Sequence, residues 1–341
     1  MYANEKKINF LFLKWLNISL LLVFIIIIVG GLTRLTNSGL SITEWELLDG
    51  ILPPLSDKSW QIYFDQYKKI PQYKLLNFNM SLDEFKIIFY WEYFHRILAR
   101  MIGIFFLIPL IFFYFSKKID KKLINNCIII FILIVLQGII GWLMVKSGLV
   151  NNTTVSHYRL AVHLSTAFII ISSIFWVKKN FISKKNKFFY NFTNRNLPFQ
   201  ILILLIFAQI IMGAFVSGLD AGKIYQTWPM MGDSYLPDDL KYTKISSIFE
   251  FNNHSLVQFY HRNLAYIIIL YVLLLSVFIY RKKIFNLFRP LTKLIFVLSL
   301  QVILGIFTLI SGLNIFLASL HQITSVLLIL SAINLYYFRA K

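Results

Sequence analysis

Long apolar runs dominate this chain, and short polar segments separate them. A membrane-spanning helix needs about 20 predominantly apolar residues. By that measure the sequence predicts an all-α polytopic membrane protein with eight transmembrane helices. The predicted spans are Trp15–Leu32, Phe89–Phe115, Leu123–Val145, His157–Val177, Phe199–Ser217, Val257–Tyr280, Leu291–Ser311 and Phe316–Phe338.

Basic residues occupy every second connection between these spans, together with both ends of the chain. Lys and Arg accumulate on the cytoplasmic side of membrane proteins, so both the N- and C-termini are predicted to be cytoplasmic. The same pattern accounts for the net charge of +19 and argues against nucleic acid as a partner. Membrane lipid is the expected surrounding of a chain that is 58% hydrophobic.

Two long connections, Thr33–Ile88 and Gly218–Leu256, are predicted to lie outside the membrane. The first contains an amphipathic piece, Trp60–Ile70, and the spacing of a capping box from Ser81 to Glu84. We expect a helix to start there and to run into the second span. Loops of this length often fold over a site, although plain connectors are the alternative.

The two halves of the chain resemble each other. Each half contains four spans, an even number, so the halves share one orientation and are related by an axis along the membrane normal. The expected architecture is a pair of pseudo-symmetric four-helix bundles, residues 1–196 and 197–341. Glycines in the first, third and seventh spans favour close helix packing. The repeated segments are Gln137–Leu149 with Gln301–Leu313, and Gly30–Trp45 with Gly213–Trp228.

Four histidines lie in the spans, two in each half, and all are predicted near the outer face. Ionisable groups inside a membrane are costly and usually functional. Two imidazoles facing each other in a helical bundle are typical ligands of a heme iron. Interfacial histidines that hydrogen-bond to neighbours are the simpler alternative, and copper or zinc would need further ligands that the sequence does not supply. The four residues are His95, His163, His261 and His321.

Glu92 precedes His95 by three residues, which places both on one helix face. The second half has Gln258 at the matching position. A carboxylate beside a heme can move protons or stabilise developing positive charge, whereas a hydrogen bond to a neighbour is its structural alternative. We therefore expect chemistry in the first half and a fixed cofactor in the second.

Other polar residues carry weaker signals. His254 is expected to be solvated, and His157 to contribute polarity and no coordination. The single cysteine, Cys127, excludes an intramolecular disulfide. Arginines near the sites could pair with heme propionates or extend to the membrane interface, and these are Arg34, Arg96, Arg100, Arg159 and Arg262.

In its motifs the chain resembles the heme A synthase family, in particular the mitochondrial and alphaproteobacterial branch. The resemblance runs nearly from end to end. It rests on Gly31–Thr36 with Ser38–Ser41, Trp45 with Leu52–Pro54, Met80–Lys86, Glu92 with His95-Arg96, Tyr158–Leu160 with His163-Leu164, Gly218–Gly222, Thr227–Met231 and Gln258–Arg262.

The resemblance implies oxidation of the ring methyl of heme o to a formyl group, which gives heme a for cytochrome oxidase. It implies that His95 and His163 belong to the substrate heme site, that His261 and His321 ligate a heme b cofactor, and that Glu92 is important for turnover. The composition fits a bacterial inner membrane, with an organelle as the alternative, and the topology puts the heme sites towards the outer face. A heme o synthase (the farnesyltransferase) and an unidentified electron donor would be partners, and a homo-oligomer is an open alternative to a monomer. Another branch has paired cysteines in an outer loop, which this chain lacks.

Two other functions compete with the enzyme. A di-heme membrane cytochrome b would transfer electrons without chemistry of its own, but electron transfer across a membrane favours hemes in both leaflets. A transporter built from repeats would have broken helices and polar sites near the midplane. The sequence predicts neither feature.

Overall fold

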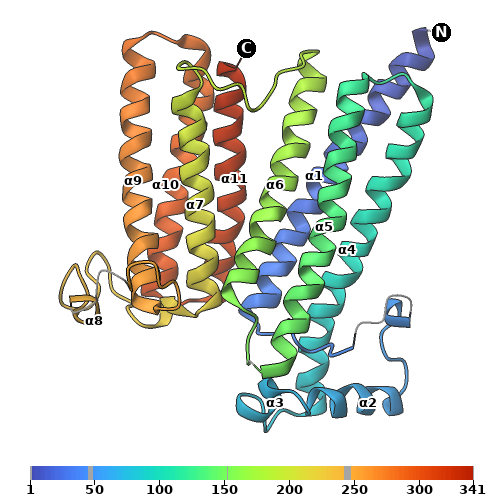
Figure 1. Ribbon diagram of the computed structural model, residues 1–341, viewed down its shortest axis with the longest axis vertical. Coiled ribbons are helices and arrows are strands. Elements are labelled where there is room, and N and C mark those ends of the chain that lie inside the picture. The colour runs from blue at the N-terminus through green and yellow to red at the C-terminus, as the bar shows by residue number, and fades with distance from the viewer. Residues whose placement is uncertain (1, 45–48, 152, 242–246, 341) are drawn as a thin grey trace. The chain divides into compact units, whose positions relative to one another are not determined.

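The computed structural model describes residues 2–44, 49–151, 153–241 and 247–340, and Trp45 lies outside this part of the chain. Within it, eight helices are long and apolar enough to cross a membrane, as predicted, and there is no strand beyond the isolated bridge between Met231 and Ser234. The eight helices (Figure 1) are α1 Tyr2–Leu35, α4 Leu82–Ser116, α5 Lys121–Asn151, α6 His157–Ser183, α7 Leu197–Gly218, α9 His254–Arg281, α10 Phe288–Ile310 and α11 Ile315–Arg339.

Most of these helices extend beyond the predicted apolar spans, and α4 shows why. Its first turn is fixed by the predicted capping box, in which the Ser81 hydroxyl accepts from the Glu84 backbone N–H at 3.3 Å. The Glu84 carboxylate accepts in return from the Ser81 backbone N–H at 2.8 Å. Polar capping lets a helix begin well outside the hydrocarbon core. The 35 residues of α4 span about 52 Å, against about 30 Å for that core.

The chain divides into two compact units, Met1–Ala167 and Phe168–Lys341, and the boundary falls inside α6. In the first unit, α4 packs against both α1 and α5. In the second unit, α7, α9, α10 and α11 form a closed ring in which each helix packs against two others (Figure 1). The predicted division into four-helix halves at residue 196 stays a prediction.

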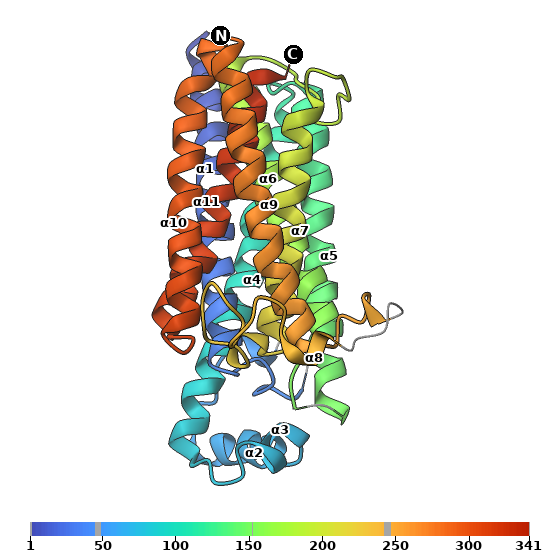
Figure 2. The ribbon, with the colours of Figure 1, turned by 90° about the vertical axis from the view of Figure 1, so that its left-hand side faces the viewer.

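The segment between α1 and α4 folds into helices that lie across the end of α4 (Figure 2). They are α2, Asp57–Tyr67, and α3, Pro71–Leu75, preceded by a short 3-10 turn at Asp49–Ile51. α2 starts before the predicted Trp60 because Ser56 caps it. The buried rings of Trp60, Phe64, Tyr67, Phe85 and Phe89 pack together with Leu40 and Ile42, and we call this group the aromatic cover.

Hydrogen bonds tie the aromatic cover to its own segment and to the end of α1. The Tyr67 hydroxyl donates to Gln72 Oε1 at 3.0 Å and accepts from Asn77 Nδ2 at 2.8 Å. Gln72 Nε2 donates to the backbone oxygen of Asn37 at 3.1 Å. Burial raises the pKa of Tyr67, so the phenol stays neutral and keeps both bonds at physiological pH.

In the second unit, residues of α6 and of the segment after it contact the last turns of α11. Lys187, in the segment between α6 and α7, donates to the backbone oxygen of Tyr337 at 2.8 Å and also to that of Ala340. Trp176 stacks on Tyr336 with ring centroids 5.5 Å apart. The last carbonyls of a helix lack partners inside the helix, so the ammonium stabilises this end of α11. The connection between α7 and α9 contains short helical turns at Ala221–Lys223 and Asp238–Lys241.

Candidate functional site

Each of the four predicted histidines packs against a glycine of the helix that precedes it. A Cβ placed on Gly30 or Gly141 would lie 3.0 Å from Cε1 of His95 or His163, respectively. In the second unit the matching distances are 3.2 Å from Gly213 to His261 and 2.8 Å from Gly305 to His321. Any side chain at these positions would displace the ring. The glycines therefore form four cradles, one per imidazole.

The structure brings the histidines together in the predicted pairs. The rings of His95 and His163 are close enough to interact electrostatically, and so are those of His261 and His321. The buried Nδ1 atoms of His95, His163 and His261 have no hydrogen-bond partner among the described residues. A half-buried imidazole pair with unpartnered nitrogens is suited to accept a ligand or an ion.

The donor set of each pair fits a heme. Among the residues that the structure describes, no group of three or more His, Cys, Asp or Glu side chains could hold a metal ion. Two imidazoles without a third protein donor suit an iron whose other positions are filled by a porphyrin. Together with the glycine cradles, this arrangement matches axial ligation of a flat cofactor.

In the second unit, glutamine amides orient both histidines. Gln209 Nε2 donates to the backbone oxygen of His261 at 3.0 Å. Gln301 Nε2 lies 3.3 Å from His321 Nε2, and His321 Nδ1 donates to the backbone oxygen of Gln301 at 3.0 Å. A proton on Nδ1 leaves the lone pair on Nε2, which is the form of imidazole that binds iron. The Gln301 amide that faces this lone pair would have to move aside for a bound iron.

In the first unit only one histidine has such an amide. Gln137 Nε2 donates to the backbone oxygen of His163 at 3.0 Å. The three glutamines each precede a cradle glycine by four residues, but Ile26 stands at that distance before Gly30. His95 therefore lacks the amide that the other three histidines have. We did not predict these contacts from the sequence, although the recurring Gln-x-x-x-Gly spacing was the signal for them.

Glu92 is buried at 2% exposure and lies at the centre of a hydrogen-bond network. One carboxylate oxygen accepts from the Ser41 hydroxyl at 2.8 Å and from the Ile42 backbone N–H at 3.0 Å. The other accepts from Nε of Arg96 at 3.0 Å and from its Nη2. The Arg96 Nη2 also donates to the backbone oxygen of Ile42 at 2.9 Å. The carboxylate thus joins α4 to the chain that follows α1.

The second unit repeats this link without the carboxylate. Gln258 Nε2 and Arg262 Nη2 each donate to the backbone oxygen of Tyr225 at 2.9 Å. In the internal repeat Tyr225 corresponds to Ile42, so the two arginines hold equivalent carbonyls. The difference between Glu92 and Gln258 is therefore a difference of charge within a shared framework.

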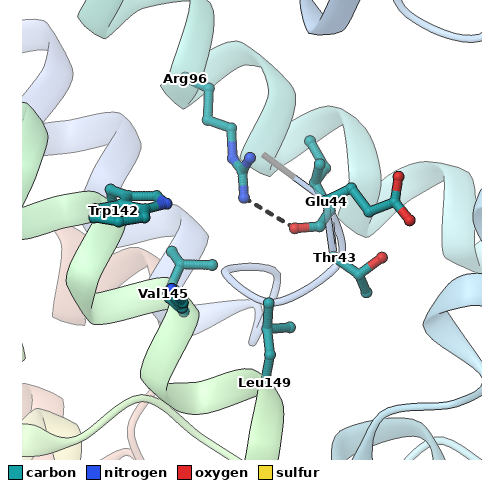
Figure 3. A pocket seen from close by; sticks show the side chains of 8 residues that line it. Thr43, Glu44, Arg96, Trp142, Val145 and Leu149 are labelled. Carbon is teal, nitrogen blue, oxygen red and sulfur yellow. Dashed lines mark hydrogen bonds between the residues drawn. The ribbon is translucent and has the colours of Figure 1, made fainter. Parts of the chain in front are cut away.

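A cavity of about 270 Å³ lies beside the Glu92–Arg96 pair in the first unit (Figure 3). Arg96 of α4 lines one side, and Trp142, Val145, Lys146 and Leu149 of α5 line another. The chain after α1 closes it with its residues 42–44.

The remaining polar residues behave differently from one another. His254 is exposed at the start of α9, as predicted. His157 is buried and lies against Tyr158, with ring centroids 4.1 Å apart. Arg159 Nη1 donates to the backbone oxygen of Leu143 at 3.0 Å, Arg34 Nη1 to Asn37 Oδ1 at 3.0 Å, and Arg100 Nη1 to the backbone oxygen of Gly50 at 3.4 Å.

Comparison with known proteins assigns the family. The model of the COX15-CtaA family, described as cytochrome oxidase assembly protein, matches residues 13–333. The chain belongs to this family. A heme A synthase of Pelagibacter ubique is 48% identical over 343 aligned residues, which cover 99% of each protein. The heme A synthase of Parvibaculum lavamentivorans is 46% identical over 74% of this chain and 72% of its own length. That of Flavobacterium johnsoniae is 38% identical over 95% of this chain and 96% of its own length.

Membership confirms the resemblance read from the motifs. It agrees with the prediction of a multi-pass membrane enzyme of heme a synthesis, because relatives named heme A synthase align with nearly the full chain. Two of the relatives that match it, from Pelagibacter and Parvibaculum, are alphaproteobacterial, as the predicted branch requires.

Proposed function

We propose that this chain oxidises the ring methyl group of heme o to a formyl group and so produces heme a. The observation that carries the proposal is a duplicated pair of cradled histidines with a buried carboxylate in one copy only. Two heme sites with the same role would need no difference in charge between them. A difference in charge is expected when one site carries out chemistry and the other transfers electrons.

The residues divide between the two halves accordingly. His95 and His163 bind the iron of the substrate heme in residues 1–196, and His261 and His321 ligate a heme b cofactor in residues 197–341. When bound there, heme b would supply one-electron redox chemistry. The bonds that join His261 to Gln209 and His321 Nδ1 to the backbone of Gln301 support this assignment, since a permanent cofactor benefits most from fixed ligands.

Glu92 is the catalytic residue of this proposal. Its four hydrogen bonds fix the carboxylate in position. A fixed anion stabilises positive charge that develops on a substrate, and it can receive a proton as a C–H bond breaks. Arg96 holds the carboxylate by two nitrogens and positions it next to His95.

The setting of the reaction follows from the topology. We place the protein in a bacterial inner membrane, with both heme sites towards the outer face and both termini in the cytoplasm. Heme o would reach the first half from the farnesyltransferase that makes it, and a redox partner would exchange electrons with the heme b half. The aromatic cover would then shield the substrate half from water.

Extraction of the hemes from the purified protein tests the proposal. Heme b together with heme o or heme a is the expected content. A protein that contains heme b alone, even when heme o is available in the cell, would instead be an electron-transfer cytochrome.

A further inference from the structure

The cavity in the first unit is lined by a lysine, Lys146, to which the proposed function gives no role. Its α5 wall places Trp142, Val145, Lys146 and Leu149 on one helix face, since residues three and four apart are neighbours. Lys146 is the cation of this face, and its ammonium lies 5.1 Å from the centroid of the Trp142 ring.

The ammonium lies close to the level of the His163 cradle. Trp142 directly follows Gly141, against which the His163 ring packs. A helical side chain leans towards the N-terminal end of its helix, and the contact with Trp142 shows that Lys146 does so. Across the cavity, Arg96 directly follows His95. Neither histidine lines the cavity, but the residue after His95 and the residue after the His163 cradle glycine both do.

The charged residues of the cavity lining are Arg96, Lys146 and Glu44. Glu44 belongs to the lining, but its carboxylate accepts from Gln66 Nε2 at 2.9 Å, and Figure 3 shows it turned away from Trp142 and Val145. Arg96 is bound to Glu92 and Ile42. Lys146 is thus the cation best placed to bind an anion that enters the cavity.

The second unit does not repeat this wall. In the internal repeat Trp142, Val145 and Lys146 correspond to Ile306, Leu309 and Ile310, all of them apolar. A lysine needed only to hold a helix at the membrane surface would have no reason to be limited to the unit that has Glu92. Its restriction to that unit points to a ligand of that unit alone.

We propose that Lys146 binds a propionate of the substrate heme in this cavity, where it holds the macrocycle in one orientation relative to Glu92. The inference rests on the proposed function. A heme has carboxylates on one edge only, so an ammonium that pairs with one of them fixes which edge of the ring faces this wall. This limits which ring methyls can face the catalytic carboxylate. Lys146 is a positioning residue in this scheme.

Binding of heme o and of its dimethyl ester tests the inference, measured by Soret absorbance on the full-length protein in nanodiscs. Lys146→Met should weaken binding of heme o by about tenfold and leave binding of the ester unchanged. Lys146→Arg should restore binding of heme o. Lys86→Met is the matched control, because Lys86 pairs with Asp83 outside the cavity, and it should change neither.

Three results would overturn the inference: unchanged binding of heme o by Lys146→Met, an equal loss for the ester, or a loss seen only in nanodiscs with anionic lipid. The last result would identify a lipid headgroup as the anion. A wild-type protein that binds heme o through Lys146 but never forms heme a would contradict the proposed function and leave this inference intact.

Discussion

Gly141 and His163 lie so close that a Cβ on the glycine would stand 3.0 Å from Cε1 of the imidazole. Gly138, one turn earlier on the same helix, has nothing within 4 Å of such an atom. The cradle is therefore a local property of one position on α5, and the neighbouring glycine is a control provided by the chain itself.

Gly141→Ala should displace the His163 ring. Overpacking of this kind costs about 1–3 kcal/mol, so we expect binding of heme o to weaken by roughly tenfold or more. Gly138→Ala should leave binding unchanged and stabilise the helix by up to about 1 kcal/mol. Titration with heme o and thermal unfolding of both variants measure these effects. Equal binding by the two variants would contradict the cradle.

Glu92→Gln should keep the shape of the site but remove its charge, as in the second unit. We expect the heme b spectrum to persist while heme a formation falls by roughly 100-fold or more. Glu92→Ala should stop heme a formation as well, again with heme bound. Extracted hemes, separated and quantified, provide the measurement. The reciprocal variant, Gln258→Glu, should not create a second active site, and full activity of Glu92→Gln would refute the catalytic role.

Replacement of either proposed heme b ligand should remove the low-spin spectrum of the second half. His261→Ala and His321→Ala each leave the iron with one protein ligand, so heme b content should fall strongly. His254→Ala is the matched control, since this histidine is exposed at the start of α9. An unchanged low-spin spectrum in the two ligand variants would show that the assignment is wrong.

Gln209→Leu should loosen His261 without removing it, because it deletes the amide that donates to the backbone oxygen of His261. Loss of a group that orients a metal ligand typically costs about 10-fold or more in affinity, so the protein should retain heme b with weaker occupancy. Paramagnetic resonance of the ferric protein should show a broader range of ligand orientations. Ile26→Gln offers the opposite change, because it introduces an amide beside His95, and it should slow the release of heme from the first unit.

Tyr67→Phe should loosen the aromatic cover. The variant loses the bonds to Gln72 and Asn77, worth about 1 kcal/mol each. Hydrogen exchange of α2 and α3 should therefore accelerate, while the eight long helices stay protected. The raised pKa of Tyr67 has a second consequence. The folded state disfavours the phenolate. The contribution of Tyr67 to the free energy of unfolding is therefore constant below pH 10, the ordinary pKa of tyrosine, and is lost as the pH rises above it. An α2 segment equally protected in both proteins would show that these bonds do not hold the cover.

The sequence alone predicted the features that depend on short stretches of chain. Apolar run length identified the eight helices, and the Ser81–Glu84 spacing located the start of α4. The repeat indicated which histidines would meet. All these signals are local or periodic, so they can be read without a three-dimensional structure.

The contacts between helices could not be predicted in the same way. Glycines on the spans indicated close packing, but they did not reveal that imidazoles occupy the space beside them. The bonds of Glu92 to Ser41 and Ile42 join positions about 50 residues apart. Such pairings depend on the rotation of each helix about its axis, which hydropathy leaves undetermined.

α4 runs without a break from its capping box to beyond Arg100, and this continuity limits how the protein can change over evolutionary time. Phe85 and Phe89 of the aromatic cover stand on the same helix as Glu92 and His95. A single residue inserted between Phe89 and Glu92 would rotate one group by about 100° relative to the other. Substitutions can accumulate in this stretch, but insertions and deletions cannot, so its length should stay fixed while the surrounding loops change in size.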